Sequence, residues 1–218
     1  MDSSQWLTFP ALASLPHGFT LRHPTIDVVA ERAEVLARLA SWHASFAGDL
    51  GFPQSAIRHA SQVHGREVAV VGAASPATTA EADGLITNEP GILLGIYVAD
   101  CCAIYLTDPR TGAIGLLHAG RKGTELGIAP RAIELMARTF GSRPEDLVVQ
   151  LSPCIRPPAY EVDFAADLRR HCLEAGVLPM HLHDCGLCTS SDPSRYYSYR
   201  LEKGHTGRML ALLGKPAA

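Results

Sequence analysis

The chain has 218 residues, of which 47% are hydrophobic and 19% are charged, and its formal net charge is −3. This composition predicts a folded protein with a sizeable core and excludes a disordered chain. A charge so close to neutral gives no general electrostatic reason to bind nucleic acid, so we expect a small-molecule partner and no nucleic acid.

The start of the chain lacks the features of a secretion signal. Residues 1–18 contain an early acidic residue, two prolines and no basic cluster, so no signal peptide is predicted. No window approaches the roughly 18 apolar residues that a membrane helix requires. We therefore expect a cytoplasmic protein without a membrane partner, whose six cysteines are thiols or metal ligands rather than disulfides.

Three segments have the apolar spacing of amphipathic helices. Residues 28–46 carry apolar side chains at intervals of three, four and seven, which is one face of a helix. Residues 124–140 form the second helix, although Pro130 also suits a first turn, in which case 124–127 is a separate turn. The third helix is expected at residues 163–175.

Six short runs are predicted to be strands. They are residues 67–71, 92–99, 102–108, 113–119, 147–152 and 196–201. Several are apolar on both faces, which indicates strands that are covered on both sides. No repeat or linker divides the chain, so the sequence predicts a single α+β domain over residues 1–218, with mixed β-sheets and flanking helices.

The segment DPRTG (108–112) joins two of these strands. Proline at its second position is typical of a turn, so the two strands are expected to form a hairpin. Cys101 lies just before one strand and His118 lies near the end of the other, so the hairpin places them close together. Polar groups that are buried at the end of a hairpin require hydrogen-bond or metal partners. The end that carries Cys101 and His118 is therefore a candidate functional site.

His64 adds a second imidazole to this pair. Two imidazoles and one thiolate are the three protein ligands with which a catalytic zinc keeps one position open. The alternative is a buried free thiol with two histidines bonded to backbone carbonyls. The CGLC segment (185–188) is interpreted as structural thiols, with zinc binding or redox chemistry as alternatives.

The segment GRKGT (120–124) lies between a predicted strand and a predicted helix. Glycines expose backbone N–H groups there, and a helix N-terminus favours an anion. The segment therefore indicates a phosphate or carboxylate site, with a solvated basic turn as the alternative.

Together the sequence motifs resemble the laccase-domain family, also called the multicopper polyphenol oxidase type or the peptidoglycan editing factor type, which includes zinc-dependent purine nucleoside phosphorylases. The similar blocks, in the family's order, are QVHG (62–65), EADGLIT (81–87), ADC (99–101), HAG (118–120), YEVD (160–163), YSYR (197–200) and TGR (206–208). The resemblance implies a layered fold. It also implies His64, Cys101 and His118 as metal ligands, with Zn²⁺ favoured over Cu²⁺.

The chain departs from the family's HAGWRG block, because Arg121 replaces the tryptophan and Lys122 replaces the arginine. Arg22 stands at the family's N-terminal arginine, but the glycine-rich loop that normally follows is absent. We expect Arg22, Arg121 and Lys122 to bind the substrate phosphate. Asp100 is expected to be a catalytic carboxylate, which either orients a neighbour or carries a proton, beside Cys101 and His118.

The resemblance implies a cytoplasmic, monomeric enzyme that binds a purine nucleoside and phosphate. Its reactions would be phosphorolysis of inosine, guanosine, adenosine or methylthioadenosine, and hydrolytic deamination of adenosine. Three alternatives remain. They are copper-dependent oxidation of phenols, which needs many paired histidines; a cysteine hydrolase that edits a peptidoglycan precursor, with Cys101 as nucleophile and His118 or His64 as base; and a zinc-containing nucleoside-binding protein without catalysis.

Overall fold

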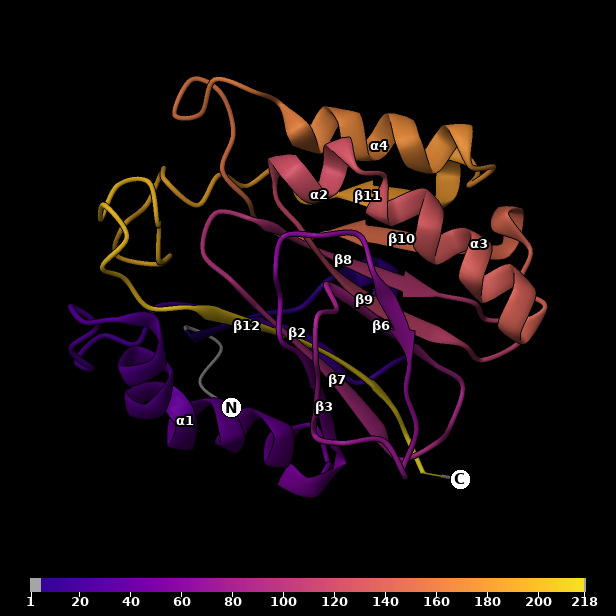
Figure 1. The fold of residues 1–218 in the computed structure, drawn as a ribbon, viewed down its shortest axis with the longest axis horizontal. Helices are drawn as coiled ribbons and strands as arrows, with labels where there is room; N and C mark the ends of the chain where they lie inside the picture. The colour runs from indigo at the N-terminus through magenta and orange to yellow at the C-terminus, as the bar shows by residue number, and fades with distance from the viewer. Residues whose placement is uncertain (1–4, 218) are drawn as a thin grey trace.

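Two mixed β-sheets lie face to face between helices in the computed structural model, which describes residues 5–217 (Figure 1). The first sheet has the order β1 (Trp6–Leu7), β2 (His17–Thr20), β12 (Met209–Lys215), β7 (Ile92–Val98), β3 (Ile57–Ala60) and β5 (Thr78–Thr79). The second has the order β11 (Leu182–Asp184), β10 (Val148–Leu151), β8 (Cys102–Thr107), β9 (Ile114–Ala119), β6 (Gly84–Thr87) and β4 (Val68–Val70). Residues 1–4 and 218 of the predicted domain lie outside the described residues.

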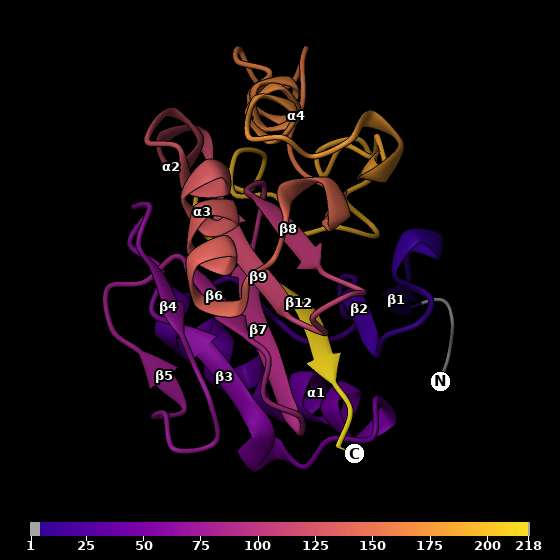
Figure 2. The ribbon, with the colours of Figure 1, turned by 90° about the vertical axis from the view of Figure 1, so that its right-hand side faces the viewer.

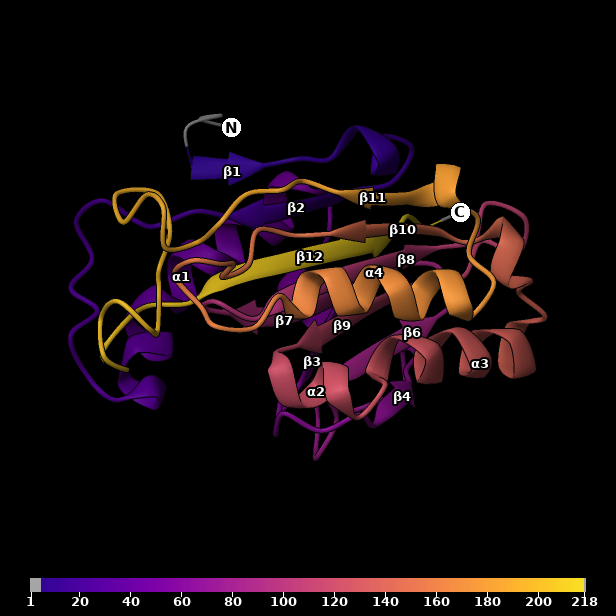
Figure 3. The ribbon, with the colours of Figure 1, turned by 90° about the horizontal axis from the view of Figure 1, so that it is seen from above.

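Helices cover the outer face of each sheet (Figures 1 and 2). Helix α1 (Arg32–Asp49) packs on the first sheet, while α2 (Arg121–Glu125), α3 (Ile128–Phe140) and α4 (Phe164–Glu174) pack on the second, as Figure 3 shows from above. Short 3₁₀ helices connect these elements at η2 (Pro10–Leu12), η3 (Gln54–Ala56), η4 (Pro144–Asp146) and η5 (Pro179–His181). The predicted layered α+β fold is confirmed.

The apolar side chains that the sequence predicts on both faces of the strands fill three cores. The central core lies between the two sheets and includes Tyr105, Leu94 and Leu116, which are completely buried. A second core joins the second sheet to α3 and α4, and a smaller third core joins the first sheet to α1. Burial of both sheet faces explains why these strands are apolar throughout.

The predicted hairpin is confirmed. Strands β8 and β9 pair antiparallel, with Ala103 opposite His118. The carboxylate of Asp108 closes the turn, because it accepts bonds from the backbone N–H groups of Arg110 (2.8 Å) and Thr111 (3.2 Å) and from the Thr111 hydroxyl (2.7 Å). Cys101 and His118 therefore lie at the same end of the hairpin, opposite this turn.

The segment predicted as one helix over 124–140 is two helices, and the alternative that places Pro130 in a first turn is confirmed. The backbone of Gly127 is left-handed (φ 79°) between α2 and α3, and Pro130 falls in the first turn of α3. A left-handed residue cannot continue a right-handed helix, and proline cannot donate the hydrogen bond that a longer helix requires. Helices α1 and α4 match their predictions, although α1 begins four residues later and ends three residues later than expected.

The predicted strand over 196–201 is wrong. Tyr196 and Tyr197 are buried, but the chain then turns, with the N–H of Glu202 bonded to the carbonyl of Ser198. The aromatic side chains fill the core from an irregular segment, which a composition rich in tyrosine does not distinguish from a strand. Strands β2, β3, β6 and β12 were not predicted, and β12 pairs with both β2 and β7.

No helix of the described part of the chain combines the length and the apolar character that are needed to cross a membrane.

Replacing Asp108 with asparagine should destabilise the hairpin by about 1–3 kcal/mol at pH 7, because the amide leaves one of the bonded donors without an acceptor. Burial raises the pKa of Asp108, but hydrogen bonds from Ser142, Thr111 and the turn lower it further than burial raises it. The stabilisation by this depressed carboxyl is complete above about pH 4 and is lost as the pH falls through the folded pKa. Urea unfolding measures the loss of unfolding free energy in Asp108→Asn relative to the wild type. This loss should be smaller at pH 3 than at pH 7, and an equal loss at both pH values would contradict the role of the Asp108 carboxylate.

Candidate metal centre

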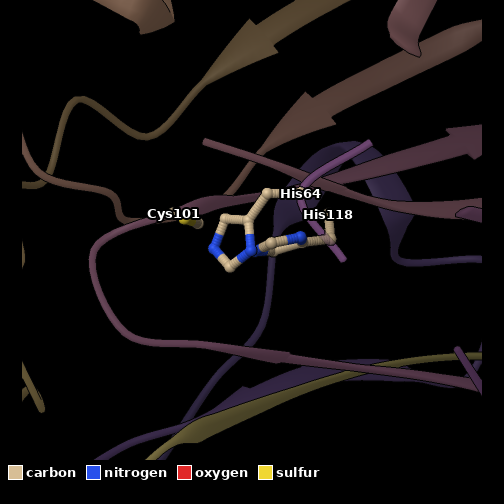
Figure 4. Close-up of side chains that lie close together, drawn as sticks. All are labelled: His64, Cys101 and His118. Atoms are coloured by element: carbon tan, nitrogen blue, oxygen red, sulfur yellow. The ribbon is translucent and has the colours of Figure 1, made fainter. Parts of the chain in front are cut away.

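His64, Cys101 and His118 come together at one end of the molecule. Their ligand atoms, two imidazole nitrogens and one sulfur, all lie within 4.8 Å of one another. His64 follows β3, Cys101 precedes β8 and His118 belongs to β9, so three separate segments supply the group (Figure 4). Within residues 5–217 this is the one group of three or more side chains with the spacing of metal ligands, and it can hold a metal ion.

A buried carboxylate, Asp83, fixes two of these ligands. It has no exposed surface and accepts hydrogen bonds from Nδ1 of His118 (2.8 Å) and from the backbone N–H groups of Val63 (3.2 Å), His64 (2.9 Å) and Gly65 (2.7 Å). Because a carboxylate only accepts, Nδ1 of His118 carries the proton and Nε2 is directed to the ligand group. Asp83 is not among the site residues predicted from the sequence, although it lies in the EADGLIT block.

The backbone is strained beside two site residues. His64 and Asp100 are left-handed, with φ of 60° and 79°, a conformation that costs roughly 1–2 kcal/mol in a residue with a side chain. The bonds to Asp83 hold the first of them in place. The carboxylate of Asp100 holds the second, because it accepts bonds from the backbone of Arg200 (2.7 Å) and the hydroxyls of Thr189 (2.6 Å) and Ser198 (3.1 Å).

Glycine is required next to the sulfur. A Cβ atom at Gly120 would lie 2.7 Å from Sγ of Cys101 and 3.8 Å from a ring carbon of His64. No real Cβ contact is as short as the first, so any side chain at this position would displace the thiol. The HAG block therefore contributes in two ways. His118 is a candidate ligand, and Gly120 leaves the space that the Cys101 sulfur occupies.

The electrostatics of the group favour a thiolate. Burial raises the pKa of Cys101, but the charge and contacts of His118, assisted by His64, lower the pKa to about 6. Burial lowers the pKa of His118, while Cys101 and Asp83 raise it to about 9. Without a metal ion the two groups therefore form a thiolate–imidazolium pair at neutral pH.

A cavity of about 970 Å³, at the upper end of the range for small-molecule sites, is lined in part by His64, Cys101 and His118. Its aromatic lining consists of Tyr97, Tyr160, Phe164 and Tyr199. Its basic lining consists of Arg32, Arg121, Lys122, Arg200, Lys203 and Arg208. Gln62 of the QVHG block also lines it and bonds through its amide to both the N–H (3.0 Å) and the C=O (2.6 Å) of Tyr97.

The structure places two of the three predicted phosphate ligands in the cavity wall. Arg121 and Lys122 both line it, but the guanidinium of Arg121 is paired with Glu125 at 2.8 Å. Arg22 does not line the cavity. Its guanidinium is paired with Glu202 at 2.6 Å and lies over the ring of Tyr197, so its position fits a role in fastening the 196–206 segment rather than phosphate binding.

Asp100 also lines the cavity, but the carboxylate that orients a ligand is Asp83. A role of Asp100 in proton transfer stays a prediction. The CGLC segment lies outside the ligand group of the described residues. Cys188 forms an isolated β-bridge with Cys154, and burial raises the pKa of Cys185 to about 11, which fits structural thiols.

Comparison with known proteins shows the family of this chain. The sequence model of the family described as "Multi-copper polyphenol oxidoreductase laccase" matches residues 27–168 and 162–215, and the chain belongs to this family. It is 34% identical over 241 residues to "Purine nucleoside phosphorylase YlmD" of Geobacillus stearothermophilus, with 93% of this chain and 84% of that protein covered.

Two further comparisons cover nearly the whole chain. The chain is 36% identical over 239 residues to a protein of Deinococcus radiodurans named "Purine nucleoside phosphorylase", with 96% of this chain and 92% of that protein covered. The crystal structure of YlmD from Geobacillus stearothermophilus superposes with a TM-score of 0.87 at 28% identity, covering 99% of this chain and 98% of that one.

Asp83→Asn should lower the affinity for a divalent metal ion by about 10- to 100-fold, because the amide cannot accept all four hydrogen bonds that orient His118 and the His64 loop. Competition with a chelator, with Zn²⁺ as the probe, measures the effect. Glu81→Gln, an exposed acid of the same segment, is the control and should bind as the wild type does. Equal affinities of the two variants would refute the role of Asp83.

Gly120→Ala should weaken metal binding by a similar factor, because the added methyl group displaces the Cys101 sulfur. The matched control is Gly48→Ala in α1, where nothing lies within 4 Å of the added Cβ. Chelator competition and thermal unfolding of both variants provide the measurement. Wild-type metal affinity in folded Gly120→Ala protein would show that the sulfur does not need this space.

Proposed function

We propose that this protein is a zinc-dependent purine nucleoside phosphorylase of the cytoplasm. It cleaves inosine, guanosine, adenosine or methylthioadenosine with phosphate and also deaminates adenosine by hydrolysis. The observation that carries the proposal is the His64, Cys101 and His118 group in the wall of a cavity that offers both aromatic and basic side chains. The names of the two relatives that are 34% and 36% identical support the same reaction.

The donor set fits zinc. One thiolate and two imidazoles are ligands that zinc prefers, and three protein ligands are typical of catalytic zinc sites. His118 is buried and oriented by Asp83, whereas His64 is exposed, so the group is accessible from the cavity. Zinc held by these residues supplies Lewis-acid chemistry.

Phosphorolysis requires the protein to hold a purine, a ribose and a phosphate in one cavity. The cavity's aromatic rings can stack on the purine, which is apolar on its faces. Gln62 holds the backbone of Tyr97 by two hydrogen bonds, and the ring of His59 stacks behind Tyr97 with centroids 5.1 Å apart. These contacts hold Tyr97 in position, and we propose that its ring stacks on the purine base.

The Asp100 carboxylate keeps the cavity wall in place. Its three hydrogen bonds connect the start of β8 to Thr189, Ser198 and Arg200, which belong to the long segment between β11 and β12. Tyr199 and Lys203 of this segment line the cavity. Asp100 thus positions the segment that closes one side of the substrate site.

Copper-dependent oxidation of phenols receives less support from the ligand set. A multicopper enzyme needs several groups of histidine-rich ligands for its coupled metal ions. The part of the chain that the structure describes contains one such group, of three residues. We therefore propose zinc, although the family description names copper.

One observation favours a second candidate function. The pKa of about 6 for Cys101 beside the pKa of about 9 for His118 describes an activated cysteine nucleophile with its partner acid. The second candidate is therefore a cysteine hydrolase acting on a peptidoglycan precursor. Bound zinc would occupy the same sulfur, so metal content separates the two candidates.

The test is metal content followed by phosphate-dependent release of hypoxanthine from inosine. We expect about one zinc per chain and turnover that requires phosphate. His118→Ala should lose both, because it removes a ligand, while His205→Ala, an exposed residue that does not line the cavity, should keep both.

Other outcomes identify the alternatives. Zinc without turnover of any purine nucleoside would indicate a binding protein. Protein that is purified without metal, is inactive with added zinc and is inactivated by alkylation of Cys101 would indicate the hydrolase.

A further inference from the structure

Two arginines of the cavity have no carboxylate partner. Arg32 begins α1 and Arg208 immediately precedes β12, and both line the cavity. None of the ion pairs formed within residues 5–217 includes either of them. By contrast, the other two arginines of the lining are neutralised, Arg121 by Glu125 at 2.8 Å and Arg200 by Glu161 at 2.7 Å.

The guanidinium of Arg208 is held in place from one side. Its Nη1 atom donates to the carbonyl oxygens of Thr206 and Gly207, both at 2.8 Å. Its Cζ lies 5.9 Å from the centroid of the Tyr199 ring. These contacts hold the group from one side. Its other N–H groups have no protein acceptor among the described residues, so they are available to a ligand.

Both guanidinium groups border the cavity that Cys101 and Asp100 also line. Burial lowers the pKa of Arg208, and the positive charge of Arg32 lowers it further, while Cys101 and Asp100 raise it. Cations that line one cavity raise the local concentration of anions there.

The acidic residues of the cavity do not form ion pairs with these two arginines. They are Glu31, Asp100 and Glu125. Asp100 already accepts three hydrogen bonds from Thr189, Ser198 and Arg200, and Glu125 is paired with Arg121. Glu31 is exposed at the start of α1 and forms no ion pair within the described residues.

We propose that Arg32 and Arg208 form the subsite for inorganic phosphate in the cavity that His64, Cys101, His118 and Tyr97 also line. The inference rests on the proposed function and names the residues that bind its second substrate. A guanidinium offers a fork of N–H donors that matches phosphate oxygens, so two of them can hold the anion in one orientation. Lys122 lines the same cavity and contributes a positive charge, but its ammonium group lacks the planar fork of donors.

The first experiment measures binding of inorganic phosphate to the zinc-loaded protein by calorimetry at low ionic strength. Arg32→Gln should weaken binding at least about tenfold, the factor for loss of a charge-assisted hydrogen bond. Arg208→Lys should also weaken it, because the charge remains and the fork is lost. Arg38→Gln, on the same helix but outside the cavity, removes the same charge and should bind as the wild type does.

The outcome that overturns the subsite is wild-type affinity in both Arg32→Gln and Arg208→Lys. A loss of equal size in the Arg38→Gln control would also overturn it, because general electrostatics would then explain the effect. Arg32 is exposed in the first turn of a long helix, so its substitution leaves the fold intact. Zinc content must equal that of the wild type in every variant compared.

Steady-state kinetics distinguish failure of the subsite from failure of the proposed function. If both are right, Arg32→Gln raises the KM for phosphate at least about tenfold and leaves the KM for inosine nearly unchanged. Phosphorolysis with an unchanged phosphate KM would refute the subsite alone. Phosphate binding that depends on Arg32 and Arg208, in a protein that cleaves no purine nucleoside, would refute the proposed function alone.

Discussion

The geometry of the candidate metal centre depends on the hydrogen bonds of the buried Asp83 carboxylate. A carboxylate without solvent is costly unless hydrogen bonds satisfy it, and this one accepts four. Three of the donors belong to the loop that carries His64, and the fourth is the ring of His118. One side chain therefore fixes the position of one ligand's backbone and the orientation of another ligand's imidazole.

The layered fold explains how distant segments meet there. The β8–β9 hairpin places Cys101 and His118 at one end of the second sheet, and β3 of the first sheet delivers the His64 loop to the same end. Helix α1 on one outer face and α2 on the other begin near this end, so both contribute residues to the cavity wall. The cavity is thus lined by elements from all the layers.

The parts of this arrangement that follow from local chemistry were predictable. The DPRTG turn predicts the hairpin, and the hairpin alone brings Cys101 and His118 together. The helix interruption at Gly127 was less visible, because it depends on a left-handed backbone. The tyrosines of residues 196–201 misled the prediction, since buried aromatic side chains in a loop have the same composition as a strand.

The electrostatic partners could not be predicted from sequence, because they are set by the fold. Arg22 is paired with Glu202, which lies 180 residues later in the chain, and it lies outside the cavity lining. Arg208 forms no ion pair within residues 5–217, and nothing in its sequence neighbourhood indicates this. Asp83 was within reach of prediction as an acidic residue just before an apolar strand, but its four donors come from two segments that only the fold brings together.

X-ray absorption at the zinc edge of the purified protein measures the ligand set of the proposed centre. We expect one sulfur ligand at about 2.3 Å and nitrogen or oxygen ligands at about 2.0–2.1 Å. Cys101→Ser should remove the sulfur shell, while Cys185→Ser should leave it intact. A spectrum with two or more sulfur ligands, or a sulfur shell that survives Cys101→Ser, would contradict a centre built from His64, Cys101 and His118.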